Sequence, residues 1–348
     1  MTSCTTRYIQ PQDIDAPEYI HFLESFHGEG TFSLWRKYML WYWQLGDNGF
    51  RVLTAKRGDE YIGQACAYRV RAFVNGTEQD LWWGVDNFVI APMRGKGVGK
   101  LLQSQLHRDL RNFSSAWYAP ANNTIKRQCG AHGIMTFSFG YYPVSSYFSI
   151  LMELAMKQLI SMKISVPRIR IPWIYSMINS PRNKGLNNYK LQDIDLVQLP
   201  SLSNFIEGCL KDKEFHVIRS EQYLQWKYVS NPRTRCRAVV ARNDDTTVGL
   251  IVFSEILEQK VVHAMARVVK VYDILSTPTS GLTYKHLLYM LSEYLHKRGE
   301  RIDGFKLLQN VAWHPSLLYP KNRELLSTLN VGELSSGYIT YIDQDMEG

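Results

Sequence analysis

Residues 86–102, DNFVIAPMRGKGVGKLL, run from an apolar strand through a glycine-rich turn into a helix. The strand is predicted by the apolar run 88–90, and Pro92 ends it because proline has no amide proton to give to a sheet. Apolar residues then recur at spacings of three and four, which predicts a helix with one buried face. The expected buried positions are Val98, Leu101, Leu102, Leu106 and Leu110.

The turn between this strand and this helix has the composition of an anion site. Glycine lacks a Cβ, so it adopts positive φ and lets backbone N–H groups approach a ligand closely. The start of a helix adds unbonded N–H donors and the positive end of its dipole. The turn contains three glycines, Gly95, Gly97 and Gly99, and three basic residues, Arg94, Lys96 and Lys100. We therefore expect it to bind a pyrophosphate. A turn without a ligand is the alternative, which the crowding of three cations at a helix start disfavours.

Two other phosphate-binding motifs do not fit this turn. A P-loop requires G-x-x-x-x-G-K-(S/T), which the chain lacks. The dinucleotide fingerprint requires G-x-G-x-x-G after a strand, whereas the glycines here are spaced by two throughout.

The segment RGKGVG, residues 94–99, resembles the (Q/R)-x-x-G-x-(G/A) loop of the GCN5-related N-acetyltransferases, the GNAT superfamily. The resemblance implies a mixed α/β fold in which this loop holds the pyrophosphate of coenzyme A and the preceding strand pairs with the pantetheine arm. It implies acyl-CoA as the co-substrate. The residues implied to bind it are Val89, Ile90, Arg94, Gly95, Lys96, Gly97, Val98, Gly99 and Lys100, together with Asn122 or Asn123. A helix N-cap is the alternative role for the two asparagines.

Composition restricts the other possibilities. A chain of 348 residues is long enough for two domains. The net charge of +8 suits anionic ligands, but the basic residues are scattered rather than striped, which argues against nucleic acid. Five cysteines without a CxxC motif indicate reduced thiols and a cytoplasmic location, and the His and Cys spacing predicts no metal site. No signal peptide or membrane span is expected, since charges interrupt the most apolar stretch, residues 150–166.

The other elements are expected in an order that fits this fold. Helices are expected over 19–26, 31–45 and 124–129, and strands over 50–55, 61–70, 79–85, 115–119, 133–139 and 145–153. Asn75-Gly76 predicts a hairpin turn, while Asn122-Asn123 and Gly130 predict the two ends of the short helix. The aromatic helix over 31–45 either lines an acceptor site or packs against the sheet, and both interpretations stay open.

The second half of the chain repeats the first at an offset of 186 residues. Matches at this offset include Tyr42 and Tyr228, Arg51 and Arg237, Ala55 and Ala241, Gly63 and Gly249, Pro92 and Pro278, and Leu101-Leu102 and Leu287-Leu288. The second loop, residues 280–286, keeps one glycine of three and gains bulky side chains, so we expect it to hold no pyrophosphate. The prediction is a tandem GNAT fold with the acyl-CoA loop in residues 1–156, a connector over 157–190 and a degenerate copy over 191–348.

Amine acylation needs a base near the amine and an acid near the leaving thiolate. The resemblance makes Asp86 the candidate base, because many members carry an acidic residue on this strand. At a period of two, Asp86 shares a face with Phe88 and Ile90, so it needs a bulge or the strand end to reach the cleft. If neither is present, Asn87 faces the cleft instead.

The resemblance also makes Tyr141 and Tyr142 candidate acids, because they follow the short helix at about the distance at which such enzymes place a tyrosine. Packing in the core is the alternative role for either one. Further options for acid–base work are His27, Glu29, His132, His216 and His314.

Together these features predict a cytoplasmic acyl-CoA-dependent N-acyltransferase that transfers its acyl group directly to an amine. Tandem copies with an aromatic acceptor side resemble enzymes that acylate nucleotide-linked amino sugars with acetyl, larger acyl or hydroxyacyl groups, and the basic charge suits a diphosphate. A protein, peptide or polyamine N-acetyltransferase and a non-catalytic acyl-CoA-binding protein are the alternatives. An oligomer is possible.

Overall fold

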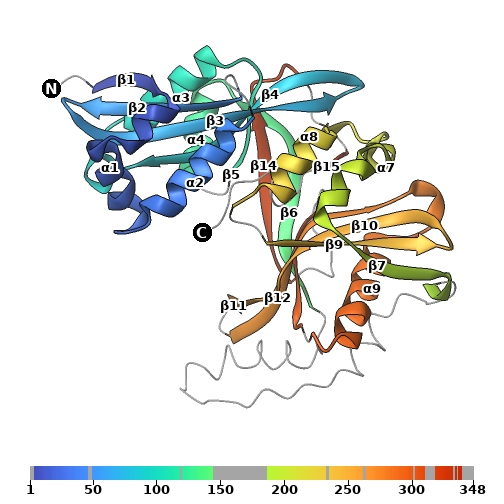
Figure 1. The fold of residues 1–348 in the computed structure, drawn as a ribbon. Helices are drawn as coiled ribbons and strands as arrows, with labels where there is room; N and C mark the ends of the chain where they lie inside the picture. Colours follow the sequence, from blue (N-terminus) through green and yellow to red (C-terminus); the bar gives the residue numbers. More distant parts are fainter. Residues whose placement is uncertain are drawn as a thin grey trace, which may run out of the picture.

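The computed structural model describes residues 4–45, 49–117, 120–143, 186–232, 235–261, 264–300, 302–309 and 318–331, together with 334 and 336–338. The chain forms a mixed α/β fold of two lobes, one from each half of the sequence (Figure 1). Two long strands near the centre run from one lobe to the other.

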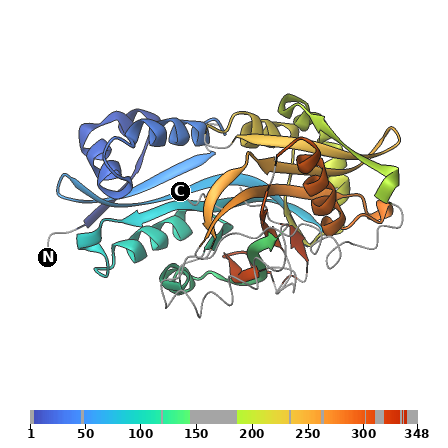
Figure 2. The ribbon, with the colours of Figure 1, turned by 90° about the horizontal axis from the view of Figure 1, so that it is seen from below.

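The first lobe is a sheet with helices on both faces (Figure 2). Its strands are β1 (Cys4–Ile9), β2 (Phe50–Arg57), β3 (Glu60–Val74), β4 (Thr77–Val89) and β5 (Phe113–Trp117), in that spatial order. Its helices are α1 (Pro17–His27), α2 (Phe32–Trp43), α3 (Val98–Asp109) and α4 (Pro120–Gln128). The helices α1 and α2 cover one face and α3 covers the other.

Helix α3 packs on the sheet through the apolar stripe that the sequence predicts, with one exception. Val98, Leu102 and Leu106 are buried, whereas Leu101 is 38% exposed, so its expected burial is wrong. The helix comes close to the sheet at Gly63, where an added Cβ would lie 3.2 Å from side-chain atoms of both Val98 and Leu102. Glycine at this position therefore sets how closely the helix approaches the sheet.

The second lobe repeats this arrangement. Its main strands are β7 (Tyr189–Ile194), β9 (Cys236–Asn243), β10 (Thr246–Ser254), β12 (Ala264–Ser276) and β13 (Gly304–Gln309). Its helices are α7 (Ser203–Leu210), α8 (Glu221–Leu224), which continues as a π-helix over Gln225–Val229, and α9 (Tyr284–Lys297). There are also three short strands, β8 (Phe215–Val217), β11 (Leu257–Val261) and β15 (Gly337–Tyr338), and short 3-10 turns between elements.

The repeat predicted from the sequence is a repeat of structure. Four pairs of elements begin 186 residues apart: α1 and α7, β2 and β9, β3 and β10, and α3 and α9. Gly249 has the packing role of Gly63, because a Cβ there would lie 3.0 Å from Leu287 of α9. The tandem arrangement of two similar units is thus visible in the chain itself.

The two units exchange their last strands. Strand β6 (His132–Pro143) follows the first unit in sequence but pairs with β13 of the second, while β14 (Leu318–Ser327) pairs with β5 of the first. The two exchanged strands also begin 186 residues apart and pair antiparallel with each other, with Phe137 opposite Arg323. Because these two positions are equivalent in the repeat, a local two-fold axis passes between them. One continuous sheet, β1-β2-β3-β4-β5-β14-β6-β13-β12-β10-β9-β7, results.

A second junction joins the aromatic helix α2 to the π-helix of the second unit. The ring of Trp41 stacks on that of Trp226 with centroids 4.3 Å apart and planes inclined by 4°. Each indole N–H donates to the backbone carbonyl of the other tryptophan, at 2.8 and 3.0 Å. Tyr38, Trp41 and Tyr42 are buried, which favours the core-packing interpretation of this helix.

Other predictions have mixed outcomes. The hairpin turn at Asn75-Gly76 is confirmed, with φ of 46° and 81°. Helix α4 begins at Pro120, so Asn122 and Asn123 lie in its first turn and the prediction that they cap it is wrong. The closing strand expected over 145–153 and most of the connector lie outside the described residues. The bounds of the two domains therefore stay a prediction.

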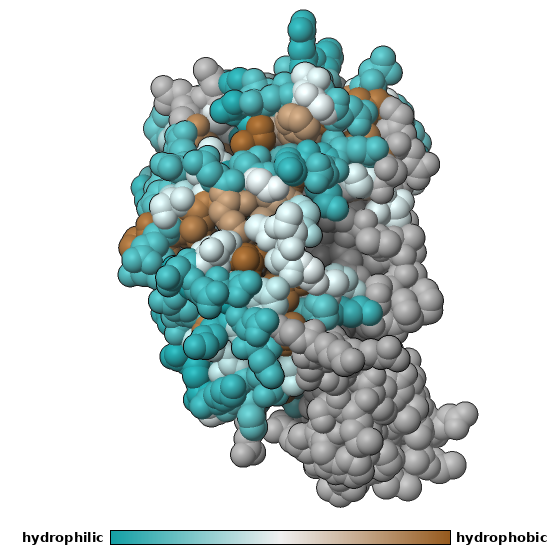
Figure 3. All heavy atoms as spheres, turned by 90° about the vertical axis from the view of Figure 1, so that its right-hand side faces the viewer, coloured by the Kyte–Doolittle hydropathy of each residue, from teal (hydrophilic) through white to brown (hydrophobic). Residues whose placement is uncertain are grey.

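The surface is mixed in character. The face on the right of Figure 1 is mostly hydrophilic, with apolar residues in small groups (Figure 3). Of the helices that the structure describes, none is both long enough and apolar enough to cross a membrane. None of the five cysteines, all of which are described, forms a disulfide. Within the described ranges no cluster of three or more His, Cys, Asp or Glu residues is placed to hold a metal ion.

Candidate functional site

The glycine-rich turn has the geometry of an anion-binding loop. Gly95 and Gly97 adopt φ of 74° and 86°, a region that costs other residues about 1–2 kcal/mol. Gly97 is the N-cap of α3 and no side chain caps the helix, so its first-turn N–H groups are left to a ligand or solvent. Arg94 precedes this turn, and its side chain reaches back to the end of β4, where Nε–H donates to the Val89 carbonyl at 3.0 Å.

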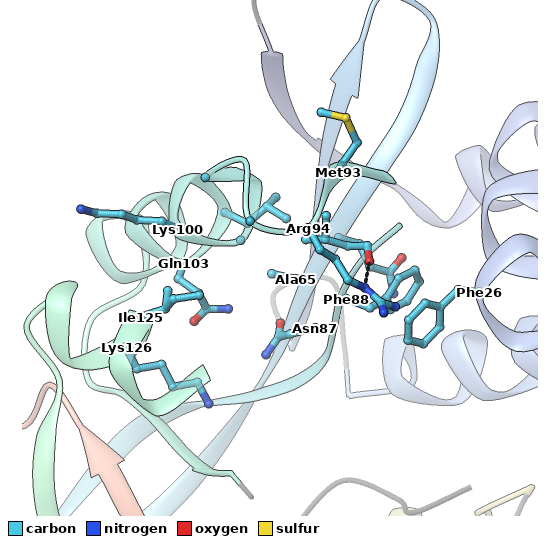
Figure 4. Close-up of a pocket in the computed structure, with 16 residues that line it drawn as sticks. Phe26, Ala65, Asn87, Phe88, Met93, Arg94, Lys100, Gln103, Ile125 and Lys126 are labelled. Carbon is cyan, nitrogen blue, oxygen red and sulfur yellow. Dashed lines mark hydrogen bonds between the residues drawn. The ribbon is translucent and has the colours of Figure 1, made fainter. Parts of the chain in front are cut away.

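A pocket of about 520 Å³ lies between this turn, strand β4 and helix α4. Among the described residues, β4 and β5 pair at Trp82–Phe113 and Trp83–Ser114 only, and the pocket lies beyond this short pairing. It is lined by Phe26, Gln64, Ala65, Asn87, Phe88, Val89, Met93, Arg94, Gly95, Gly97, Gly99, Lys100, Leu102, Gln103, Ile125 and Lys126 (Figure 4). Among these described residues the charged side chains are all cationic, which favours an anionic ligand.

A β-bulge in β4 decides which side chain faces the pocket. Gln64 pairs with Phe88 and Cys66 with Val85, so two residues of β4, Asp86 and Asn87, stand opposite one residue of β3. Asp86 takes a positive φ of 44° at this bulge. The bulge that the sequence analysis required is therefore present, but the residue that lines the pocket is Asn87.

The same bulge determines on which face of the sheet each of the following side chains lies. Phe88 packs on α1, where its ring lies 5.1 Å from that of Phe22 and 4.0 Å from that of Phe26. Val89 packs with the cluster under α3. Phe88 therefore lies on the α1 side of the sheet and not under α3. The partly exposed Phe26 forms an aromatic wall at the pocket.

Two amide side chains offer complementary hydrogen-bonding atoms to the pocket. Asn87 uses its Oδ1 to accept from the Cys66 backbone N–H at 3.1 Å, and its Nδ2 is buried with no partner among the described residues. Gln103 on α3 is buried, and its Oε1 likewise has no partner there. Figure 4 shows both side chains directed into the same space. Buried polar atoms are normally hydrogen-bonded. Asn87 Nδ2 is therefore a donor, and Gln103 Oε1 an acceptor, that a ligand could use.

The third polar group of this region is a buried lysine. Lys126 of α4 is 1% exposed, and burial lowers the pKa of its ammonium well below the usual value. Its side chain extends toward Asn87 at the end of the pocket opposite Met93 (Figure 4). Its charge also lowers the pKa of His107 on α3, after the larger effect of burial. Sequence reasoning missed both Lys126 and Gln103, although Gln103 interrupts the apolar face of α3.

The predicted acyl-CoA residues divide into two groups. The structure brings six of them together around the pocket: Val89, Arg94, Gly95, Gly97, Gly99 and Lys100. The other three do not line the pocket. Ile90 donates its N–H to the Ile62 carbonyl at 3.1 Å. Val98 is buried between α3 and the sheet, and Lys96 is exposed on the turn. Asn123 on α4 is half-buried, with its Oδ1 unbonded among the described residues, and the side chain of Asn122 lies outside them.

The predicted catalytic residues lie on two strands. Asp86 is close enough to α1 that its charge raises the pKa of Tyr19, after the larger effects of burial and Cys66. Tyr141 and Tyr142 lie on β6, with backbones opposite Lys306 and Phe305 of β13. Their side chains lie outside the described part of the chain, so their roles stay predictions.

The other acid–base options are dispersed. His27 stacks on Trp35 at 3.7 Å between ring centroids, and Glu29 is exposed after α1. His132 is hydrogen-bonded to the Val331 carbonyl, and buried His216 contacts Glu207 at 3.1 Å. His314 lies outside the described residues. None of these described groups lines the pocket.

The equivalent loop of the second unit, residues 280–286, has a different structure at the start of its helix. Gly281 keeps the positive φ of Gly95, at 69°. Thr283, the counterpart of Gly97, caps α9: its hydroxyl accepts from the His286 N–H and its own N–H donates to His286 Nδ1. One first-turn N–H is therefore bonded within the chain, and Leu282 is buried in the core beside the turn. Both features disfavour a phosphate at this turn, in agreement with the sequence-based expectation.

Comparison with solved structures identifies the fold. No family model and no curated protein sequence matches the chain. Among solved structures, a GCN5-related N-acetyltransferase from Anabaena variabilis matches with a TM-score of 0.57 at 12% identity, over 93% of this chain and 72% of that one. A probable N-acyltransferase from Enterococcus faecalis matches with a TM-score of 0.55 at 9% identity, over 94% and 72%.

A third structure, Saccharomyces cerevisiae N-myristoyltransferase with bound myristoyl-CoA, matches with a TM-score of 0.53 at 11% identity, over 99% of this chain and 84% of that one. The matches extend over both halves of the chain, consistent with tandem units. The chain thus has the GNAT fold.

Proposed function

We propose that this protein is an acyl-CoA-dependent N-acyltransferase with one acyl-CoA site, in its first unit. The observation that carries the proposal is the uncapped start of α3 behind a turn with two positive-φ glycines, opening on a pocket lined only by cationic charges among the described residues. Helix starts of this kind bind phosphate groups. The structural neighbours include N-acetyltransferases and an N-myristoyltransferase with bound myristoyl-CoA.

The interior of the pocket suits the pantetheine arm. That arm carries two secondary amides, each with one N–H donor and one carbonyl acceptor. Gln103 Oε1 can accept from such an N–H and Asn87 Nδ2 can donate to such a carbonyl, and both atoms lack partners among the described residues. Gly99 keeps the passage open, because a Cβ there would lie 3.7 Å from Ile125 and 3.9 Å from Val89.

The thioester of the bound acyl group supplies the activated carbonyl for the reaction. The residues of this chain bind the phosphates at the turn, orient the arm along β4 and exclude water with the aromatic wall of Phe26 and Phe88. Asp86 remains the proposed base, and Tyr141 or Tyr142 the acid predicted from the sequence.

For the acceptor we propose the amine of a nucleotide-linked amino sugar, on the basis of the family resemblance and the net charge of +8. Acetyl, larger acyl and hydroxyacyl groups all stay candidates. Acylation of a protein, peptide or polyamine is the second candidate, and a non-catalytic acyl-CoA-binding role is the third.

The test combines binding with turnover. Calorimetry measures CoA binding to the wild type, Arg94→Ala and Gly95→Ala. The matched control is Gly281→Ala, because Gly281 has nearly the same φ and does not line this pocket. We expect affinity to fall about tenfold or more in Arg94→Ala, which removes a charge-assisted contact, and to fall in Gly95→Ala, which strains the positive-φ turn; it should stay unchanged in the control.

Thiol release is then followed with a panel of acyl-CoAs against amino sugar nucleotides, peptides and polyamines. Turnover only with peptides or polyamines would replace the amino sugar as acceptor. CoA binding without turnover on any amine would favour the non-catalytic role. Absence of CoA binding to the wild type would refute the proposal itself.

A further inference from the structure

The ring of Phe26, near the end of α1, is an exposed aromatic surface at the candidate pocket. Phe26 is 40% exposed although it lines that pocket. A single exposed apolar side chain on an outer surface needs no explanation. Leu34 of α2, which is 49% exposed and does not line the pocket, is of that ordinary kind. Phe26 differs because its ring is part of the surface that a ligand would contact.

Neighbouring rings fix the orientation of Phe26. Its ring stacks on that of Phe88, with centroids 4.0 Å apart and planes inclined by 14°. Phe88 in turn stacks on Phe22, one turn earlier on α1, at 5.1 Å and 21°. His27 borders both Phe26 and Phe88 and is nearly perpendicular to them. Among the described residues no further ring contacts Phe26, so no aromatic group covers its second face.

Arg94 brings a cation toward this ring. Its side chain points toward Phe26 and Phe88 (Figure 4), and all three residues line the pocket. The Nε–H of Arg94 is bonded to the Val89 carbonyl, while its two terminal nitrogens have no partner among the described residues. A guanidinium binds a phosphate through two N–H groups at once. These nitrogens are therefore available to an anionic group near the aromatic surface.

An exposed ring beside a phosphate-binding cation favours one class of ligand. Every nucleobase has a π-face that stacks on an aromatic side chain. An acyl chain is better held by an enclosed apolar pocket than by a ring that solvent reaches. A flat base joined to a phosphate uses both the ring and the cation.

We propose that Phe26 and Arg94 form a binding site for a nucleotide, in which the base stacks on Phe26 and a phosphate bonds to Arg94. This inference rests on the proposed acyl-CoA function, in which the turn after Arg94 receives phosphates. The nucleotide comes from one of two sources, the adenosine end of CoA or the nucleotide part of the acceptor. Both present the same chemistry to the ring.

Calorimetry with three kinds of probe distinguishes the sources. CoA carries both a base and phosphates, whereas phosphopantetheine carries a phosphate and no base. Purine and pyrimidine nucleoside diphosphates, added to the complex with CoA, test for an acceptor nucleotide. Each probe is titrated into the wild type and into variants of Phe26.

The variants separate stacking from simple apolar cover. Phe26→Leu keeps an apolar side chain but removes the flat ring, and Phe26→Trp keeps an aromatic ring. Stacking of a base on an aromatic side chain is worth about 5–150-fold in affinity, so we expect a loss of that size in Phe26→Leu and none in Phe26→Trp. The tryptophan variant also guards against a folding defect in the leucine variant. Leu34→Ala is the control, because Leu34 does not line the pocket and should leave every affinity unchanged.

The probe that responds identifies the source. If the base belongs to CoA, Phe26→Leu weakens CoA binding and leaves phosphopantetheine binding unchanged. If it belongs to the acceptor, CoA binding is unchanged and a nucleoside diphosphate binds the CoA complex more weakly.

Three results would overturn an inference. Equal affinities of the wild type and Phe26→Leu for CoA and for every nucleoside diphosphate would refute the nucleotide site while leaving the acyl-CoA site intact. An equal loss with CoA and phosphopantetheine would show that Phe26 only packs on the arm, and would refute the nucleotide site as well. No CoA binding to the wild type would refute both proposals.

Discussion

The stacked pair Trp41 and Trp226 is expected to couple the stability of the two units. Trp226→Phe keeps the stacking but removes the indole N–H, so the Trp41 carbonyl loses that donor and keeps the Gln44 N–H at 3.1 Å. The net loss of one such hydrogen bond costs about 0.5–1.5 kcal/mol. Trp41→Phe removes the corresponding hydrogen bond to the Trp226 carbonyl. Trp226→Ala loses the ring as well, and large aromatic truncations in a core cost about 3–5 kcal/mol.

The coupling is measured by a double-mutant cycle in urea, with the free energy of unfolding determined for each single variant and for the double. Because the two tryptophans touch, we expect an interaction energy of about 0.5–3 kcal/mol. Trp43→Phe is the control, since Trp43 lies on the same helix and contacts Phe50 of its own unit. Additive effects of Trp41→Phe and Trp226→Phe, or separate unfolding of the two units in the wild type, would refute the reasoning.

Three further predictions concern packing, charge and capping. Gly249→Ala should lower the free energy of unfolding by about 1–3 kcal/mol, measured in urea, because its methyl group would lie 3.0 Å from Leu287. Lys126→Met should raise the stability of the ligand-free protein at pH 7. Because the folded pKa of Lys126 is depressed, the wild type is penalised below the unfolded pKa of about 10.4, and the advantage of the variant should vanish as pH rises through that value in a thermal melt series. Thr283→Ala should cost about 1 kcal/mol by removing the N-cap that bonds His286, with no change in CoA affinity by calorimetry.

Local sequence patterns were sufficient to predict much of the fold. The strand, turn and helix around Gly95 and Gly97 follow from residue spacing and from the backbone freedom of glycine. The burial of Leu101 was predicted wrongly, because the apolar spacing of α3 allows a wider buried stripe than the sheet covers. The repeat was predictable because it requires only comparison of the chain with itself.

What the sequence could not show depends on contacts between distant residues. The bulge at Asp86 arises from the pairing of β3 with β4, and it decides that Asn87 lines the pocket. Lys126 reads as a surface residue of a short polar helix until α4 is packed on α3. The exchange of β6 and β14 joins segments almost two hundred residues apart, which no local propensity encodes.

That exchange has a consequence for synthesis. The first unit contains every residue of the glycine turn, yet the strand that pairs with the free edge of its β5 is β14, among the last elements to leave the ribosome. Until then a nascent first unit exposes an unpaired edge, which is a site for erroneous association. The completed chain is equivalent to a strand-swapped dimer whose two copies share one backbone. Neither unit can therefore be excised with its sheet complete.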